Sequence, residues 1–376
     1  MRKSLGQLLR DLQPDPKQRY EITWRALRPP PQSTLLPDMV FITLARCLDY
    51  PYAMKPFEKT LWAIPVCFKG IALRIEHAKF GLRFFTESPD ESAPLVSELA
   101  SVLGRAFRLA EQLIQPFVES QIRAGRVTLR NIFVMLEDRY RFLRKHAEAA
   151  YESDPPAINV THRDEHGQPM GWTGDPMKPT REGFYFGSAA LDAYFSRLEH
   201  FLVLALPFCG FDPAADDLVS LVTMTWGDKF KRIFPLDVDR DAQRLYQKLR
   251  DVKERFRNTI AHGGFEKGVS SLFVHFPPVG AVPAQMSEYP DSIHFSMYPI
   301  AGPTFHDVCS VFDETDAHLA RSRTRFAYKY AGSGLDVAFD AHTVEEYRLA
   351  SSSDEAFEEF IERQGYFHDM HANMDW

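Results

Sequence analysis

The sequence contains few cysteines and no long hydrophobic run. Its 376 residues include four cysteines, none of them in a C-x-x-C pair: Cys47, Cys67, Cys209 and Cys309. This scarcity argues against a zinc ribbon, a thioredoxin-like redox site and a disulfide scaffold. The longest apolar run, residues 201–209, is far shorter than the roughly 20 residues that cross a bilayer. The basic N-terminus has no apolar segment typical of a signal peptide. We therefore expect a soluble, cytoplasmic protein with no membrane partner.

An excess of positive charge is also missing. Lys and Arg number 44 and Asp and Glu number 51, so the formal net charge is −7. A protein that coats nucleic acid without regard to sequence is normally basic, and that class is disfavoured. One stretch is basic, since residues 229–257 hold ten Lys or Arg against five Asp or Glu. Acidic residues gather instead in the last 26 positions.

The chain has no P-loop, no Rossmann fingerprint and no G-x-S-x-G motif. Its composition, with 45% hydrophobic and 13% aromatic residues, is sufficient to form a core. Its length suits two or three domains. We therefore expect a globular protein whose chemistry, if it has any, does not use these nucleotide-binding or hydrolase motifs.

The first 151 residues are predicted to form a helical domain. Residues 55–85 are apolar and aromatic throughout, and Pro65 and Gly70 suggest a kinked helix or two shorter ones. Ser92 is a candidate cap for a helix that continues to Gly125, and a second helix is expected from Thr128. We predict a sensor, partner-binding or regulatory role for this domain, which the sequence does not specify further.

The remaining chain is predicted to hold a linker, a second helical domain and a tail. The linker or long loop is residues 152–183, which are rich in Pro, Gly, Asp and Thr. In the second domain, residues 184–330, four helices are expected at 188–206, 218–234, 239–262 and 305–320, and strands 269–276 and 292–297 are expected to pair as a hairpin. Residues 331–376 read as an acidic tail with short helices. The predicted fold class is mainly α, with an inserted β-hairpin.

The most informative stretch is R-F-R-N-T-I-A-H-G-G at residues 255–264, which closes the third of these helices. The two glycines are typical of a helix C-terminus. On an α-helix, Asn258 and His262 are i,i+4 neighbours, and Arg255 lies on the same face seven residues before His262. Arg257 precedes His262 by five residues and points to the side unless the last turn is distorted. Arg255 and Arg257 are therefore alternatives for the functional arginine.

These side chains suit chemistry on a phosphate. Arginine presents a fork of donors that matches phosphate oxygens and stays charged at any working pH. Histidine gives or takes a proton near neutral pH. In RNA the 2′-hydroxyl already lies beside the phosphorus, so the effective concentration of the nucleophile is high. A protein then needs only to move a proton and stabilise the added negative charge, and no metal is required.

The string Arg257-Asn258-x-x-x-His262 resembles the R-N-x-x-x-H signature of the HEPN superfamily (higher eukaryotes and prokaryotes nucleotide-binding domains). In that family a polar residue, often Asn, follows the Arg, and the His comes four to six residues after the Arg. The family domain is a small all-α bundle with the motif at the end of a late helix. The resemblance covers about residues 184–325.

Two further stretches carry the resemblance. Leu198-Glu199 is similar to a pair on the first helix of the family domain, and W-G-D-K-F-K-R-I-F at residues 226–234 resembles its second helix. In one subgroup a Tyr that is adenylylated by an antitoxin lies two residues after the motif His. Gly264 occupies that position here, which argues against this route of modification.

The resemblance implies a metal-independent endoribonuclease that leaves a 2′,3′-cyclic phosphate and uses no cofactor. It implies that His262 is the general acid or base, that Arg257, with Arg255 as a possible assistant, stabilises the phosphoryl charge, and that Asn258 orients His262 or the phosphate. Active members work as dimers or paired domains, so the single motif here implies a homodimer with a composite site. Members act as toxins, abortive-infection proteins and other phage-defence nucleases, and an antitoxin or sensor protein is an expected partner.

The basic stretch adds candidate RNA-binding residues, namely Lys229, Lys231 and Arg232. One alternative is a non-catalytic module that dimerises or binds RNA, a nucleotide or a protein, in which Arg257 and His262 are structural. A weaker alternative is a metal hydrolase that uses His162 and His166, four residues apart. If Arg257 and His262 are catalytic, replacing them with alanine would leave the free energy of unfolding nearly unchanged. If they are structural and cap the helix, their loss would cost about 1 kcal/mol.

Overall fold

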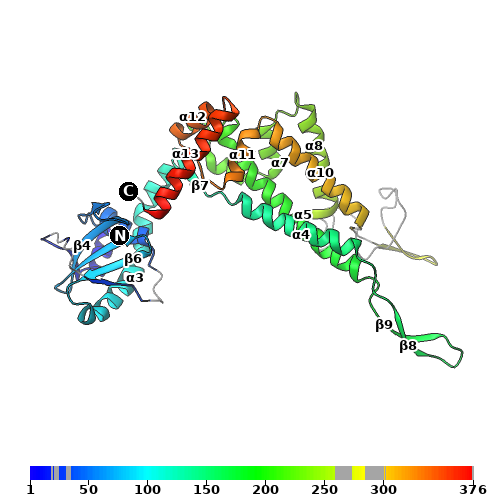
Figure 1. Cartoon of the computed structure of the whole chain (residues 1–376), viewed down its shortest axis with the longest axis horizontal. Coiled ribbons are helices and arrows are strands. Elements are labelled where there is room, and N and C mark those ends of the chain that lie inside the picture. Colours follow the sequence, from blue (N-terminus) through cyan, green and yellow to red (C-terminus); the bar gives the residue numbers. More distant parts are fainter. Residues whose placement is uncertain are drawn as a thin grey trace. The chain divides into compact units, whose positions relative to one another are not determined.

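The computed structural model describes residues 1–17, 20, 25–30, 35–258, 273–283, 300 and 302–374. The chain divides into two compact units (Figure 1). Unit 1 consists of Met1–Ala124 and Glu358–Trp376, and unit 2 is Gly125–Phe357. Helices predominate over strands, as expected of a mainly α protein. In the part of the chain that is described, no helix combines the length and apolar character needed to cross a membrane.

Unit 1 is built on an antiparallel sheet with helices packed against it. The strands are β1 (Leu12–Pro14), β2 (Arg25–Leu27), β3 (Ala53–Met54), β4 (Thr60–Phe68), β5 (Ile71–Ala78) and β6 (Gly81–Thr86). Their order is β1-β4-β5-β6-β2, and β3 pairs with β4. The helices of the N-terminal part are α1 (Arg2–Leu8), α2 (Pro37–Phe41), the π-helical segment η1 (Ile42–Cys47) and the long α3 (Pro89–Arg123).

The helices predicted over residues 55–85 are wrong, because this segment forms strands β4 to β6. The loop between β4 and β5 is only two residues long, and its Lys69 and Gly70 both have positive φ, 50° and 83°. Such a pair matches the type I′ turn that the twist of a hairpin favours. The alternation of buried Leu82 and Phe84 along β6 has the period of a strand. The N-terminal part is therefore not the helical domain that its apolar composition suggested.

The helix expected from Ser92 is present, but it begins earlier. α3 begins at Pro89, with Ser88 as the N-cap. Ser92 lies inside the first turns, and its buried hydroxyl shares a 3.0 Å hydrogen bond with the hydroxyl of Thr86 on β6. Ser92 therefore ties the helix to the sheet instead of capping the helix.

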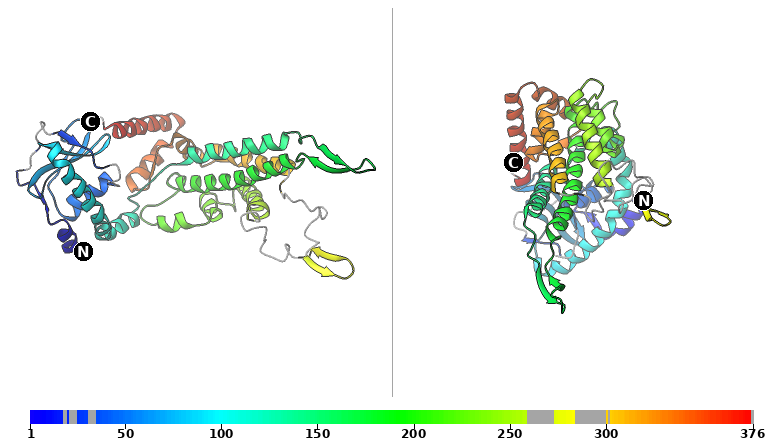
Figure 2. Two further views of the ribbon diagram at one scale, coloured as in Figure 1. Left: turned by 90° about the horizontal axis from the view of Figure 1, so that it is seen from below. Right: turned by 90° about the vertical axis from the view of Figure 1, so that its right-hand side faces the viewer.

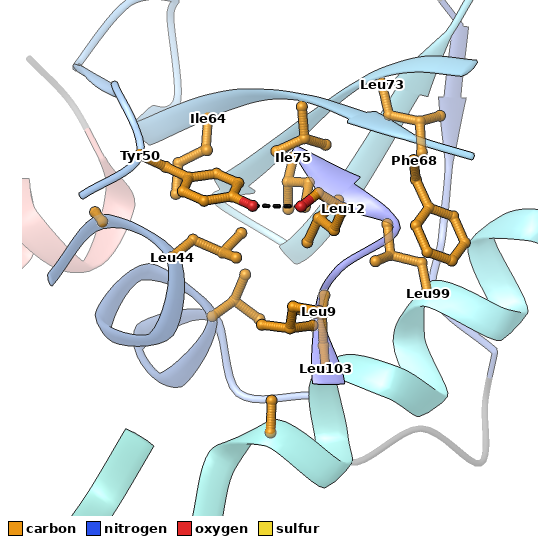
Figure 3. Packing of buried hydrophobic residues seen from close by; sticks show 14 of the residues in the cluster. Leu9, Leu12, Leu44, Tyr50, Ile64, Phe68, Leu73, Ile75, Leu99 and Leu103 are labelled. Atoms are coloured by element: carbon orange, nitrogen blue, oxygen red, sulfur yellow. Dashed lines mark hydrogen bonds between the residues drawn. The ribbon is translucent and has the colours of Figure 1, made fainter. Parts of the chain in front are cut away.

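The core of unit 1 lies between the sheet and the helices (Figure 3). Ile64, Leu73 and Ile75 from the sheet meet Leu99 from α3 in this layer. Within it, the Tyr50 hydroxyl donates a 2.5 Å hydrogen bond to the carbonyl oxygen of Leu12. Burial raises the pKa of Tyr50 to about 12. The phenol therefore stays protonated and keeps its role as a donor inside the core.

Unit 2 is a helical bundle with short strand pairs. Its helices are α4 (Phe133–Glu152), α5 (Lys178–Leu204), α6 (Leu218–Thr223), α7 (Trp226–Ile233), α8 (Arg240–Val252), α10 (Gly302–Arg321), α11 (Arg325–Ser333), α12 (Ala341–Ala350) and the start of α13 (Asp354–Asn373), with the shorter turns η2 (Leu206–Phe208) and η3 (Lys253–Asn258). The paired strands are β7 (Thr128–Leu129) with β12 (Val337–Ala338), β8 (Asn159–Arg163) with β9 (Pro169–Thr173), and β10 (Phe273–Phe276) with β11 (Gly280–Pro283).

The long helices α4 and α5 lie side by side in unit 2 (Figures 1 and 2). A buried arginine on α5, Arg197, forms ion pairs with Glu137 on α4 and Asp316 on α10. Its guanidinium carbon lies 4.6 Å from the ring centroid of Tyr194, whose ring stacks on that of Phe312 of α10 at 3.6 Å. One charged side chain thus joins three helices.

The ionisation of this cluster follows from burial and the shared arginine. Burial opposes the charged form of Glu137, but the guanidinium groups of Arg197 and Arg141 outweigh it and lower the pKa of that carboxyl. The pKa of Asp316 is raised, because its burial outweighs the attraction of Arg197. Removing one member of a buried ion pair typically costs about 3–5 kcal/mol, since it leaves an uncompensated charge.

Several expected boundaries differ from the observed ones. The segment taken as a linker, residues 152–183, contains the β8–β9 hairpin and the first turns of α5. The helix expected from Thr128 begins at Phe133, because Thr128 pairs with Ala338 as a strand. β10 lies within the first predicted strand, but it pairs with β11, and residues 292–297 lie outside the described residues.

The part of the chain expected to be an acidic tail contributes to the core of unit 2. Tyr347 on α12 is buried, with its ring centroid 4.4 Å from that of Phe208. Phe357 is buried too, and its ring centroid lies 4.8 Å from that of Phe326 on α11. The last helix, α13, is a continuous helix of 20 residues instead of a short piece.

A glycine on α5 leaves space for an aromatic ring, and its replacement tests this packing. A Cβ at Gly183 would lie 2.5 Å from the ring of Tyr151 at the end of α4. We expect Gly183→Ala to lower the free energy of unfolding by about 1–3 kcal/mol, as overpacking does. The measurement is urea unfolding followed by circular dichroism.

Gly332→Ala on α11 is the matched control, because nothing lies within 4 Å of its Cβ position. Alanine has the higher helix propensity, so this variant should be as stable as the unchanged protein or more stable. Equal stability of the two variants would contradict the packing argument.

Candidate active site

The motif begins at the end of α8, where the helix changes its winding. Asp239 caps α8, its carboxylate accepting a hydrogen bond from the backbone N–H of Ala242. The helix then continues as the π-helical segment η3. The backbone of Arg257 and Asn258 belongs to this segment, whereas their side chains, and the whole of His262, lie outside what the structure describes.

The winding of η3 bears on which arginine serves the motif. A π-helix has hydrogen bonds from i to i+5. Residues five apart therefore lie closer to one face of a π-helix than they do on an α-helix. Arg257 and His262 are five apart in the sequence. A distortion of the kind that would bring these two to one face is therefore present in the segment that ends at Asn258. Arg255 is exposed, and its guanidinium carbon lies 5.3 Å from the ring centroid of its neighbour Phe256.

An aromatic pair holds η3 against the bundle. The Nζ of Lys253 lies 5.3 Å from the ring centroid of Trp226 on α7 and 5.7 Å from that of Phe195 on α5. The centroids of the two rings are in turn 5.6 Å apart, edge to face. A cation placed over aromatic faces is attracted by about 0.5–2 kcal/mol. Sequence reasoning missed Lys253, for which the sequence offers no signal beyond its place four residues before Arg257.

The two stretches that carry the family resemblance meet in the structure. Lys229 on α7 donates a 2.8 Å hydrogen bond to the carboxylate of Glu199 on α5. Leu198 is buried beside Glu199, and the Lys229 side chain is almost fully covered. Lys229 therefore joins α5 to α7, and its charge is covered by the fold.

The basic stretch is largely compensated by nearby acids. Lys231 pairs with Asp228 at 3.4 Å. Arg232 pairs with Asp216 at 2.9 Å and also donates to the carbonyl oxygen of Gly210. Further along, two more cations of α8 share one carboxylate, as Arg244 and Lys248 both pair with Glu314. The net positive charge that residues 229–257 present on the folded surface is therefore smaller than the count from the sequence suggests.

A histidine next to Glu199 is held neutral. The Nε2 atom of His200 accepts a 3.1 Å hydrogen bond from the backbone N–H of Ile132, just before α4. An accepting nitrogen carries no proton, so the hydrogen bond needs the neutral ring. Burial lowers the pKa of His200, in agreement with this contact.

The alternative histidine pair lies apart from these residues along the chain. His162 is on β8 and His166 is in the turn after it. Among the described residues, no group of three or more His, Cys, Asp or Glu side chains is arranged to hold a metal ion.

The neutral state of His200 predicts a pH dependence of stability. Its pKa is lowered in the folded protein, so below about pH 6.5 the unfolded chain binds a proton that the folded chain resists. The free energy of unfolding should therefore fall as the pH drops through this range. His200→Gln keeps an acceptor but cannot be protonated, so its stability should fall less with decreasing pH. Urea unfolding on both sides of about pH 6.5 measures this.

The exposed His342 on α12 provides the control for this experiment. His342→Gln should keep the pH dependence of the unchanged protein. If His200→Gln kept it as well, the neutral hydrogen-bonded histidine would not be the cause.

No protein-family model, no curated protein and no solved structure matches the chain.

Proposed function

We propose that unit 2 is a metal-independent endoribonuclease of the HEPN type. The observation that carries the proposal is the π-helical winding of η3, which ends at Asn258 within the motif. It supports Arg257, five residues from His262, as the arginine that shares its face. A π-helical turn is rare in proteins and is frequent at functional sites.

In the proposed reaction the RNA supplies its own nucleophile. His262 acts as general base and removes the proton of the 2′-hydroxyl, or as general acid and gives a proton to the leaving 5′-oxygen. Arg257 stabilises the negative charge that gathers on the phosphoryl oxygens, with Arg255 as the alternative or assistant. Asn258 orients His262 or the phosphate. The products are a 2′,3′-cyclic phosphate and a 5′-hydroxyl.

The proposal includes a homodimer with a composite site, since the chain has one good motif. Its biological setting would be a toxin or an abortive-infection effector in phage defence, held in check by an antitoxin or sensor. Unit 1, with its sheet and long helix, would provide sensing, partner binding or regulation.

A second candidate function is a non-catalytic module that dimerises or binds RNA, a nucleotide or a protein. The observation that favours it is the pairing of basic side chains with acids, as in Lys231 with Asp228 and Arg232 with Asp216. Compensated charges attract a phosphate backbone less than free ones. In this case Arg257 and His262 would be structural.

The first test is cleavage of RNA in the presence of EDTA. We expect the unchanged protein to cut total RNA and leave cyclic phosphate ends. His262→Ala and Arg257→Ala should each lower the rate by about 100-fold or more, since general acid–base and charge-stabilising groups contribute this much. Their melting temperatures should stay close to that of the unchanged protein.

His166→Ala is the matched control, because it removes a histidine of the alternative metal site. It should cut RNA at the normal rate. Loss of activity in EDTA would favour the metal hydrolase, and absence of cleavage together with a lowered melting temperature of His262→Ala would favour the structural role.

The second test concerns the basic surface. Charge reversal at Lys231 and Arg232 should weaken RNA binding and flatten its dependence on salt, because fewer counterions are released. Filter binding at several salt concentrations measures both effects. Reversal of Arg244 and Lys248, which are also paired with an acid, is the control for overall charge. Equal effects of the two double variants would show no local RNA surface at α7.

A further inference from the structure

Lys253 lies where α8 changes its winding. Its backbone N–H still bonds the carbonyl oxygen of Leu249, four residues earlier, as in an α-helix. The same residue is the first of the π-helical segment η3, which continues to Asn258. Because π-helical turns are rare, a specific contact at this junction is expected to hold the change of winding in place.

The side chain of Lys253 is held by two helices at once. Its Nζ lies 5.3 Å from the ring centroid of Trp226 on α7 and 5.7 Å from that of Phe195 on α5. Both rings are nearly fully buried, with 6% and 4% exposure. The ring of Trp226 also packs against that of Tyr246 on α8, with the centroids 5.5 Å apart. Rings enclosed in a close-packed interior cannot follow the ammonium group, so the ammonium group is held at the position that the rings set.

A second charged contact spans the same junction. Arg250 and Glu254 form an ion pair of 3.3 Å, and their side chains are 48% and 57% exposed. Residues four apart are neighbours on an α-helix, so this pair favours α-helical winding. Water screens an exposed pair of this kind strongly. The attraction of a cation to buried aromatic rings is screened less, so the contact of Lys253 is the stronger anchor of the junction.

This anchor bears directly on the motif. Arg257 comes four residues after Lys253, within η3. On a regular α-helix, residues five apart such as Arg257 and His262 face directions about 140° apart. A segment wound with hydrogen bonds from i to i+5 reduces this angle. The direction of Arg257 therefore depends on the residue at which the π-helical winding begins.

We propose that Lys253 is the positioning residue of the motif. Its ammonium group, held by Trp226 and Phe195, fixes the winding of η3 and with it the direction of Arg257. Lys253 acts through Arg257 and needs no contact of its own with the phosphate. The inference rests on the proposed ribonuclease activity where it concerns the phosphate, whereas the winding of η3 does not depend on that activity.

The first test is the cleavage kinetics of Lys253→Met. Methionine keeps a long side chain in contact with the rings but removes the charge. We expect kcat to fall about 10- to 100-fold, as for a small misplacement of a catalytic group. KM should stay the same, because the groups that bind RNA are unchanged. Lys253→Arg should restore most of the rate, since a guanidinium group also binds aromatic faces. Melting temperatures check that each variant is folded.

Lys248→Met is the matched control. Lys248 lies on the same helix and pairs with Glu314, and its replacement makes the same change of charge, so this variant should cleave at the normal rate. In an Arg257→Ala background, Lys253→Met should lower kcat no further, because a residue that acts through Arg257 has nothing left to position. Full additivity of these two changes, or an unchanged kcat of Lys253→Met in a protein that cuts RNA, would overturn the proposal.

Amide hydrogen exchange of the full chain without RNA separates this proposal from the proposed function. Exchange in residues 253–258 should be about 2- to 30-fold faster in Lys253→Met, the factor to which a cation–aromatic contact corresponds. Lys253→Arg and Lys248→Met should exchange there like the unchanged protein. If the unchanged protein does not cut RNA but exchange changes as expected, the ribonuclease proposal fails and the anchor of η3 stands. Equal exchange in all variants would overturn the anchor, whatever the activity.

Discussion

The buried guanidinium of Arg197 is the interaction on which unit 2 depends. Arg197 lies on α5 and pairs with Glu137 of α4 and Asp316 of α10, so it fixes these helices in register. Aromatic rings surround its charge, with that of Tyr194 at 4.6 Å. A guanidinium can serve two carboxylates at once because its donors are arranged as a planar fork. The cluster cannot lose one member without leaving a charge in the interior.

The position of the motif follows from this arrangement of α5. Phe195 and Glu199 lie two residues on either side of Arg197 on the same helix. Phe195 contributes to the aromatic pair under Lys253, and Glu199 binds Lys229 of α7. The end of α8 is therefore placed by a helix whose own position is set by the buried ion pairs. The contacts that hold the motif are structural, while the chemistry proposed for it belongs to Arg257, Asn258 and His262.

Compensated charge distinguishes this surface from that of a general nucleic-acid binder. Lys231 and Arg232 each have an acidic neighbour, so binding of a phosphate backbone would have to exchange these partners.

The sequence by itself determined the helices of unit 2 whose apolar residues repeat every three or four positions, as in α5 and α10, and the motif at residues 257–262. Such periodicity is local and can be read without knowledge of partners. Only the tertiary structure decided that most of residues 55–85 form strands, because a continuous apolar segment fits a buried strand as well as a helix. It also decided that Lys229 is buried against Glu199 and that Lys253 lies on Trp226, since these contacts join residues far apart in the chain. The tertiary structure also decided the π-helical winding of η3, because the residue types of a segment do not indicate hydrogen bonds from i to i+5.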